Sequence, residues 1–194
     1  MPIDYDILIA YGGTVKKYSK GSVIFLGGDI PYFFYQIEEG EVKVFSASTE
    51  GKELIQGIFK SGESFGEPPL LLNKCYPTTA MANCDSIIVR ISKEKLLNIL
   101  KDYPDIANRM LFIFAERIYK KICFVQTLIS HTPEQKILAF FKEIKGNCKE
   151  KIMINYTRQQ IADFTGMRVE TVIRTLIKMN EEKKVDIINH KVFY

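Results

Sequence analysis

Between about residue 15 and residue 92, apolar residues come in short runs or alternate with polar ones, and glycines separate the runs. Residues 22–26 and 41–45 are two such runs, and Gly27-Gly28-Asp29 is one of the turn signals between them. Short alternating segments divided by glycine-rich turns are typical of a β-sandwich or barrel. We therefore predict an antiparallel β-domain whose last strand covers residues 86–91.

After that strand the hydrophobic period changes from two to nearly four residues. Residues 93–101 have the pattern of a short helix, and Tyr103-Pro104 is predicted to end it. One helix of about seven turns then follows from Asp105, because apolar side chains recur every three or four residues. Its stripe consists of Leu111, Phe114, Ile118, Ile122, Val125 and Ile129. A stripe longer than a small barrel can cover predicts burial against a second copy, as in a coiled-coil dimer. The alternative is a helix packed wholly within its own chain.

Residues 156–179 have the pattern of two helices joined by a tight turn. Thr157 is a good N-cap, Gln160 completes a capping box, and Gly166 allows the corner between the helices. We expect an inward-facing set of Ile161, Ala162, Val172 and Leu176. The outward-facing set, able to read base edges or bind phosphates, is then Arg168, Glu170, Thr171, Arg174 and Lys178.

Two apolar runs, residues 185–188 and 191–194, flank Asn189-His190 and predict a tight β-hairpin. A hairpin after such a helix pair makes a winged helix-turn-helix. The alternative interpretation is a small α/β domain whose charged helix face is simply solvated.

Composition agrees with a soluble protein of two small domains. The chain has 194 residues, of which 46% are hydrophobic and 26% charged. Without a long apolar run or a basic N-terminus, it is expected to be cytoplasmic. Its four cysteines form no C-x-x-C pair, so neither a metal site nor a disulfide framework is expected.

The net charge of +4 is unevenly distributed. Residues 1–130 hold 15 bases and 15 acids, whereas residues 131–194 hold 12 bases and 8 acids. The whole excess therefore lies in the last third of the chain, which favours a polyanion as its partner. A lysine-rich solvated surface would give the same count.

These motifs together resemble the Crp/Fnr family of bacterial transcription regulators over almost the whole chain. The resemblance rests on Phe65-Gly66-Glu67, on residues 115–118, and above all on residues 157–162 followed by residues 169–174. It implies an α+β fold with three parts. They are an N-terminal antiparallel, jelly-roll-like β-roll resembling a cyclic-nucleotide-binding domain (1–103), a long dimerisation helix (104–130) and a C-terminal winged helix-turn-helix (131–194).

The same resemblance implies a dimer that binds double-stranded DNA and acts with RNA polymerase. Arg174 would bond guanine, Glu170 would accept from cytosine, and Val169 could contact a thymine methyl group. We expect inverted half-sites with a TGA core. The expected DNA-binding set is Thr157, Arg158, Gln159, Arg168, Val169, Glu170, Thr171, Arg174 and Lys178.

The corresponding effector pocket would comprise Phe65, Gly66, Glu67, Thr78, Thr79, Lys121 and Ile122. Thr78 occupies the position of the arginine that neutralises the phosphate in cAMP-binding relatives, so the small-molecule effector is not expected to be cAMP. No cysteine precedes Cys75 to hold an iron–sulfur cluster, and no cofactor is expected.

The alternative function is that of a ligand-binding module that acts only through protein partners, with a cyclic nucleotide or another small molecule in the β-roll. An enzyme is not expected, because the chain has no nucleophile motif, P-loop or metal-ligand cluster.

Overall fold

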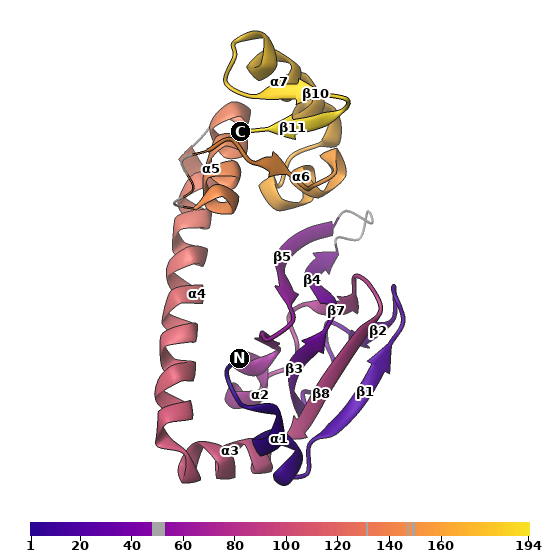
Figure 1. The fold of residues 1–194 in the computed structure, drawn as a ribbon, viewed down its shortest axis with the longest axis vertical. Coiled ribbons are helices and arrows are strands. Elements are labelled where there is room, and N and C mark those ends of the chain that lie inside the picture. The colour runs from indigo at the N-terminus through magenta and orange to yellow at the C-terminus, as the bar shows by residue number, and fades with distance from the viewer. Residues whose placement is uncertain (48–52, 131, 147, 149) are drawn as a thin grey trace. The chain divides into compact units, whose positions relative to one another are not determined.

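The computed structural model describes residues 1–47, 53–130, 132–146, 148 and 150–194, without the side chains of residues 124 and 126–130. Contacts divide the chain into two compact units, Met1–Arg117 and Ile118–Tyr194 (Figure 1). The predicted domain limits at residues 103 and 130 stay a prediction. None of the helices among these residues is both long enough and apolar enough to span a bilayer.

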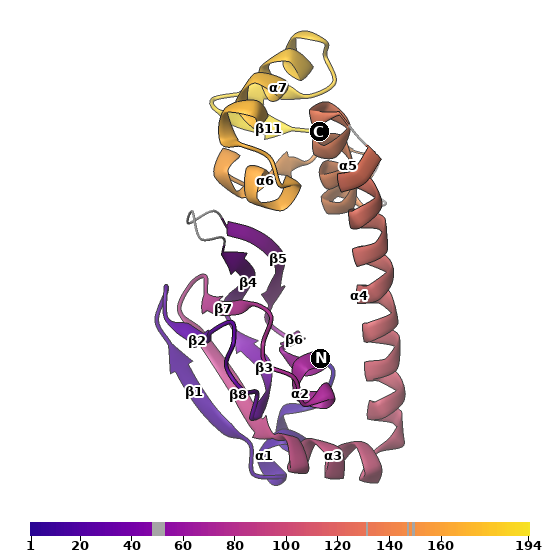
Figure 2. The ribbon, with the colours of Figure 1, turned by 180° about the vertical axis from the view of Figure 1, so that it is seen from behind.

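Within the described residues, the first unit contains two four-stranded antiparallel sheets, which confirms the predicted β-roll (Figure 2). One has the order β1-β8-β3-β6 and the other β2-β7-β4-β5. The strands are β1 Thr14–Tyr18, β2 Val23–Phe25, β3 Phe33–Glu39, β4 Glu41–Ala47, β5 Glu53–Lys60, β6 Ser64–Phe65, β7 Thr79–Ala82 and β8 Ser86–Ser92. Side chains from both sheets, such as Ile37 and Val42, form one core between them.

Among the described residues, four helices flank or leave this β-roll. They are α1 Tyr5–Ala10, α2 Glu67–Leu72, α3 Lys93–Asp102 and the long α4 Pro104–Ser130. Ser92 caps α3, because its side chain accepts a hydrogen bond from the Lys95 amide at 3.4 Å. A second core joins α1, α3 and the start of α4 to the sheet through Leu8, Ile99 and Ile106.

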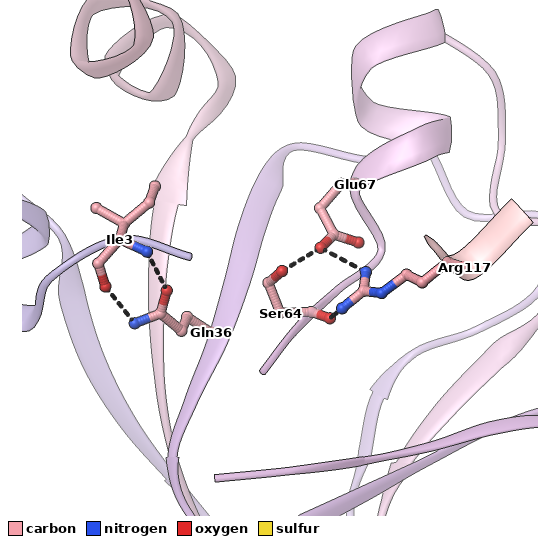
Figure 3. A network of polar contacts seen from close by, with 5 residues as sticks. All are labelled: Ile3, Gln36, Ser64, Glu67 and Arg117. Atoms are coloured by element: carbon pink, nitrogen blue, oxygen red, sulfur yellow. Dashed lines mark hydrogen bonds and ion pairs between the residues drawn. The ribbon is translucent and has the colours of Figure 1, made fainter. Parts of the chain in front are cut away.

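The N-terminal segment is attached to the sheet by one buried amide. The fully buried Gln36 of β3 accepts from the Ile3 amide at 3.2 Å and donates to the Ile3 carbonyl at 2.8 Å (Figure 3). Both backbone groups of Ile3 are thereby satisfied inside the protein, where an unpaired group would be costly.

Aromatic rings fill part of the β-roll core. Phe25 stacks on Tyr76 with centroids 3.6 Å apart, and Tyr35 stacks on Phe65 at 5.3 Å. Burial raises the pKa of Tyr35 to about 12 and also raises the pKa of Tyr76. The Tyr76 hydroxyl has no hydrogen-bond partner among the described residues.

Replacing Tyr76 with Phe is therefore expected to stabilise the protein by about 1 kcal/mol at neutral pH, since it removes a buried, unpaired hydroxyl. It should also reduce the alkaline loss of stability. Tyrosines ionise near pH 10 in the unfolded chain but at higher pH when folded, so the free energy of unfolding falls as pH rises above about 10. Urea titrations of both proteins from pH 8 to 11.5 would test this; an unchanged pH slope in Tyr76→Phe would contradict it.

The second unit confirms the predicted winged helix-turn-helix. It contains the later part of α4, then α5 Pro133–Lys145, β9 Met153–Ile154, α6 Arg158–Thr165, α7 Val169–Glu181, β10 Asp186–Ile188 and β11 Lys191–Phe193. The strands form a small antiparallel sheet of order β10-β11-β9. Ile137 and Phe141 of α5 pack with Ile161 of α6 and Leu176 of α7 in its core.

Candidate nucleic-acid interface

The start of α6 has the capping box that the sequence predicts. The Thr157 hydroxyl accepts from the Gln160 amide at 3.1 Å, and the Gln160 side chain accepts from the Thr157 amide at 2.8 Å. The first backbone N–H groups of a helix have no intrahelical partner and attract phosphate. Gln159 is exposed beside them and donates to Asp163 at 2.7 Å.

The corner between α6 and α7 depends on one glycine. Gly166 ends α6 with a φ of 64°, a left-handed conformation that glycine adopts readily, and the Met167 amide then donates to the Ala162 carbonyl at 3.0 Å. Arg168 follows as the N-cap of α7 and is exposed. The predicted inward set is confirmed, because the following four residues are all buried: Ile161, Ala162, Val172 and Leu176.

Helix α7 has one buried face and one exposed face. Val172, Leu176 and Met179 are buried, whereas Glu170 and Arg174 are exposed. Glu170 and Arg174 have no ion-pair partner within the described part of the chain.

Three other members of the predicted DNA-binding set on α7 are placed differently. Val169 and Thr171 are half-buried, and Val169 packs against the core of the second unit. Lys178 is exposed and lies 3.7 Å from Glu182. Of the predicted readers on α7, Glu170 and Arg174 are therefore the two that are exposed and have no ion-pair partner among the described residues.

The wing is a two-residue hairpin, as predicted. Ile188 pairs with Lys191, and the two residues between them, Asn189 and His190, have φ values of 49° and 62°. Two successive left-handed residues make a type I′ turn. Arg158 of α6 donates from Nη2 to the His190 carbonyl at 3.1 Å, and partial burial lowers the pKa of its guanidinium.

A groove of about 650 Å³ lies between the start of α6, helix α7 and the wing. Its lining includes Thr157, Arg158, Ile173, Ile177, Ile187 and Lys191. Ile173 and Ile177 were not among the predicted site residues, because apolar residues on an amphipathic helix are ordinarily assigned to the core. The signal in the sequence that could have identified Ile173 and Ile177 is their position on either side of Arg174, a predicted base-reading residue.

Helix α4 carries an exposed apolar stripe. Leu111, Ile118, Ile122 and Val125 expose 45–63% of their surface. Phe114, in contrast, is half-buried against the second core of the β-roll, and exposed Ala115 continues the stripe in its place. The resulting spacing alternates four and three residues, which is the a/d pattern of a coiled coil. The side chain of Ile129 lies outside the described residues.

Two exposed aromatic residues border this stripe. Phe112 and Tyr119 are 75% and 69% exposed and are seven residues apart. The prediction from the sequence did not include them.

In the β-roll, Glu67 of the expected effector pocket already interacts with two other residues of the chain. Glu67 is 1% exposed and lies 3.0 Å from the Arg117 guanidinium of α4, which also donates to the Ser64 carbonyl at 2.8 Å (Figure 3). The Ser64 hydroxyl hydrogen-bonds the same carboxylate oxygen of Glu67. Sequence reasoning did not identify Arg117 as this partner, although a buried carboxylate requires one.

The other expected pocket residues serve the fold in different ways. Phe65 is buried in the aromatic core, and Gly66 has a left-handed φ of 78° before α2. Thr79 accepts from the Gly27 amide at 3.1 Å, and Thr78 beside it is half-buried. Lys121 and Ile122 lie on α4 in the second unit and stay a prediction.

Two family models match the chain in the order of these units. The cyclic nucleotide-binding domain matches residues 15–103, and the Crp-like helix-turn-helix domain matches residues 135–193. The chain belongs to the Crp/Fnr family. This family consists of transcription regulators rather than enzymes, and its members bind DNA and typically act as dimers.

Individual relatives of this Crp/Fnr regulator are distant in sequence. It is 24% identical to the cyclic AMP receptor protein of Thermus thermophilus over 182 residues, covering 93% of the chain and 83% of the relative. It is 24% identical to the fumarate and nitrate reduction regulatory protein of Escherichia coli over 167 residues. That match covers 83% of the chain but only 66% of the relative's length.

The fold is also that of a solved regulator. The c-di-GMP-responsive global regulator CLP of Xanthomonas campestris superposes with a TM-score of 0.82 at 19% identity, covering 96% of this chain and 95% of CLP.

Proposed function

We propose that this Crp/Fnr regulator binds DNA as a dimer and reads an inverted repeat of half-sites with a TGA core. The observation that carries the proposal is the outward face of α7. Arg174 and Glu170 lie one turn apart there, exposed and unpaired among the described residues, opposite the buried face of the same helix. This face belongs to the part of the chain that holds its entire positive excess.

Each half-site would be read by a small set of side chains. Arg174 bonds both major-groove acceptors of guanine, and Glu170 accepts from the amino group of a cytosine. Arg168, Val169 and Thr171 lie at the N-terminal end of α7, from which recognition helices contact bases. Thr157, Arg158, Gln159 and Lys178 bind phosphates and fix the register.

Replacing Arg174 with Ala is expected to cost about 1–3 kcal/mol of binding free energy and to relax preference at one base pair. Replacing Lys178 with Ala should instead weaken binding to all sequences alike, because phosphate contacts carry no sequence information. Fluorescence anisotropy with matched and single-mismatch duplexes separates the two results. Equal losses on specific and random DNA for Arg174→Ala would refute its role.

The dimer would form along the apolar stripe of α4. Its a/d spacing suits a two-stranded coiled coil, and a two-fold axis along it would match the symmetry of an inverted repeat. A regulator bound in this way acts in the cytoplasm, where it meets the chromosome and RNA polymerase.

The β-roll is proposed to respond to an effector other than cAMP, or to none, and to have no catalytic role. Two observations support this. The Glu67 carboxylate is bound by Arg117 and Ser64, and Thr78-Thr79 provide no guanidinium for a phosphate.

Selection of bound duplexes from a random pool, with and without cyclic nucleotides, tests these proposals together. The expected result is one enriched inverted repeat that does not depend on added nucleotide. Affinity for that repeat should fall steeply with salt, because bound phosphates release counterions. A regulator acting only through protein partners would enrich no sequence.

A further inference from the structure

The exposed apolar surface of α4 is wider than its coiled-coil stripe. Phe112 directly follows Leu111 and Tyr119 directly follows Ile118, so each of these aromatic residues lies beside a stripe residue. Their exposed fractions of 75% and 69% exceed those of the large apolar residues in the stripe, which are 45–63%. Two large exposed rings on one flank of a helix form an apolar surface that a soluble protein ordinarily covers.

The first unit shows which flank of α4 its own β-roll covers. Successive residues turn about 100° around a helix axis, so Met110 and Phe112 lie about 100° to either side of Leu111. Met110 is 3% exposed and packs in the core that joins α4 to the β-roll. Phe114, one turn later on the flank of Met110, is partly buried against the same core. Phe112 therefore lies on the flank of α4 that faces away from the β-roll of its own chain.

A two-fold dimer along the stripe brings a second β-roll to this flank. Between two parallel helices related by a two-fold axis, the seam has two sides, and the two helices present opposite flanks to each side. On the side where one helix carries Phe112, the other helix carries Met110 and the β-roll packed on it. The rings that one chain leaves exposed thus lie next to the β-roll of the other.

The heptad positions beside the seam indicate the nearest contacts. With the stripe at positions a and d, Phe112 and Tyr119 are e residues. Ala107 and Phe114, on the flank packed against the β-roll, are g residues. In a parallel pair, the e residues of one helix lie beside the g residues of the other, and both positions often carry Glu and Lys, which stay in water. These four residues are uncharged, so a seam of two helices alone would leave two rings per chain partly in water.

We propose that Phe112 and Tyr119 pack against the β-roll of a second copy of this chain, with Tyr119 on Phe114 of the partner subunit. The occupant is a second copy because the aromatic flank continues the dimer stripe on the same helix. The two-fold axis that pairs the stripes also places the partner's β-roll at this flank. This contact rests on the dimer of the proposed function, and it extends the dimer surface from α4 to both β-rolls.

Tryptophan substitutions report whether the aromatic flank is covered, because the chain contains no tryptophan. Fluorescence of Phe112→Trp and Tyr119→Trp is measured above and below the dimer Kd that sedimentation equilibrium gives. Each is expected to emit at a shorter wavelength in the dimer than in the monomer, since its ring leaves water. Tyr32→Trp is the control: Tyr32 is 64% exposed in the β-roll and lies outside α4, so its emission should not change.

Substitutions that remove the rings measure the strength of the contact. Phe112→Ser and Tyr119→Ser are each expected to raise the dimer Kd at least about tenfold, because a two-fold dimer buries each ring twice. Tyr32→Ser should leave the dimer Kd unchanged.

A double-mutant cycle then identifies the surface that covers Tyr119. Tyr119 and Phe114 lie about 140° apart around α4, so they do not face each other within one helix. If they meet across the dimer, Tyr119→Ser and Phe114→Leu together lose less dimerisation free energy than the sum of the two single losses. Urea titration of Phe114→Leu checks that this variant is folded.

Three results would overturn the proposal in distinguishable ways. A dimer whose tryptophans keep the emission of the monomer would show that the flank stays in water, while the stripe and the proposed dimer stand. Buried tryptophans with additive losses for Tyr119 and Phe114 would mean that the rings lie against a surface other than the partner's β-roll. Folded protein that stays monomeric at every concentration would remove the proposed dimer, and this contact with it.

Discussion

Replacing Ile122 with Glu is expected to convert the proposed dimer into monomers and to weaken binding to the proposed inverted repeat by about 100-fold or more. Ile122 is 53% exposed on the stripe of α4, and in a coiled coil the substitution would bury two carboxylates at the seam. A monomer holds one half-site at a time and loses the gain from linked binding, which reaches 10²–10⁴ in affinity. Sedimentation equilibrium and anisotropy measure the two effects.

Cys123→Glu is the matched control for this prediction. It adds the same charge one residue along α4, at an exposed position outside the stripe. This variant should remain dimeric and bind DNA normally. A dimeric Ile122→Glu protein would show that the stripe is not the dimer surface.

Replacing Arg117 with Met is expected to lower the free energy of unfolding by about 3 kcal/mol. The substitution leaves the carboxylate of Glu67 buried without its cation, and breaking one side of a buried ion pair typically costs this much. Adding Glu67→Gln should recover most of the loss, because the buried charge is then gone. Urea titration of the single and double variants gives the comparison.

Lys43→Met provides the reference value for the loss of stability when a partly exposed ion pair is broken. Lys43 and Glu53 are 19% and 32% exposed, so water compensates Glu53 when its partner is removed, and a loss below about 1 kcal/mol is expected. An Arg117→Met protein as stable as this control, or a double variant no better than the single one, would contradict the assigned role of the pair.

Features set by neighbouring residues were predictable from the sequence. The Thr157–Gln160 capping box, the corner at Gly166 and the two-residue wing turn each depend on side chains within a few positions of one another. The strands were predictable because burying one face of a sheet imposes a period of two. Helix α1, with six residues, is too short to show a helical period and was not predicted.

Features that depend on distant packing were not predictable in this way. Arg117 and Glu67 are 50 positions apart, and nothing local indicates their pairing. The predicted stripe included Phe114, because this residue keeps the spacing of three and four residues. The core of the β-roll contacts the face of α4 that carries Ile106, Met110 and Phe114, and this packing partly buries Phe114.

The two-residue turn of the wing fixes how far the hairpin projects. Arg158 holds the carbonyl of His190 from the first residue of α6, so the tip of the wing and the start of that helix are tied to each other. Inserting one residue into the turn would replace the type I′ geometry with a longer loop and carry this carbonyl away from the guanidinium. The length of the wing turn is therefore constrained by the hydrogen bond between Arg158 of α6 and the His190 carbonyl. A longer turn would need another contact to hold the tip of the wing against α6.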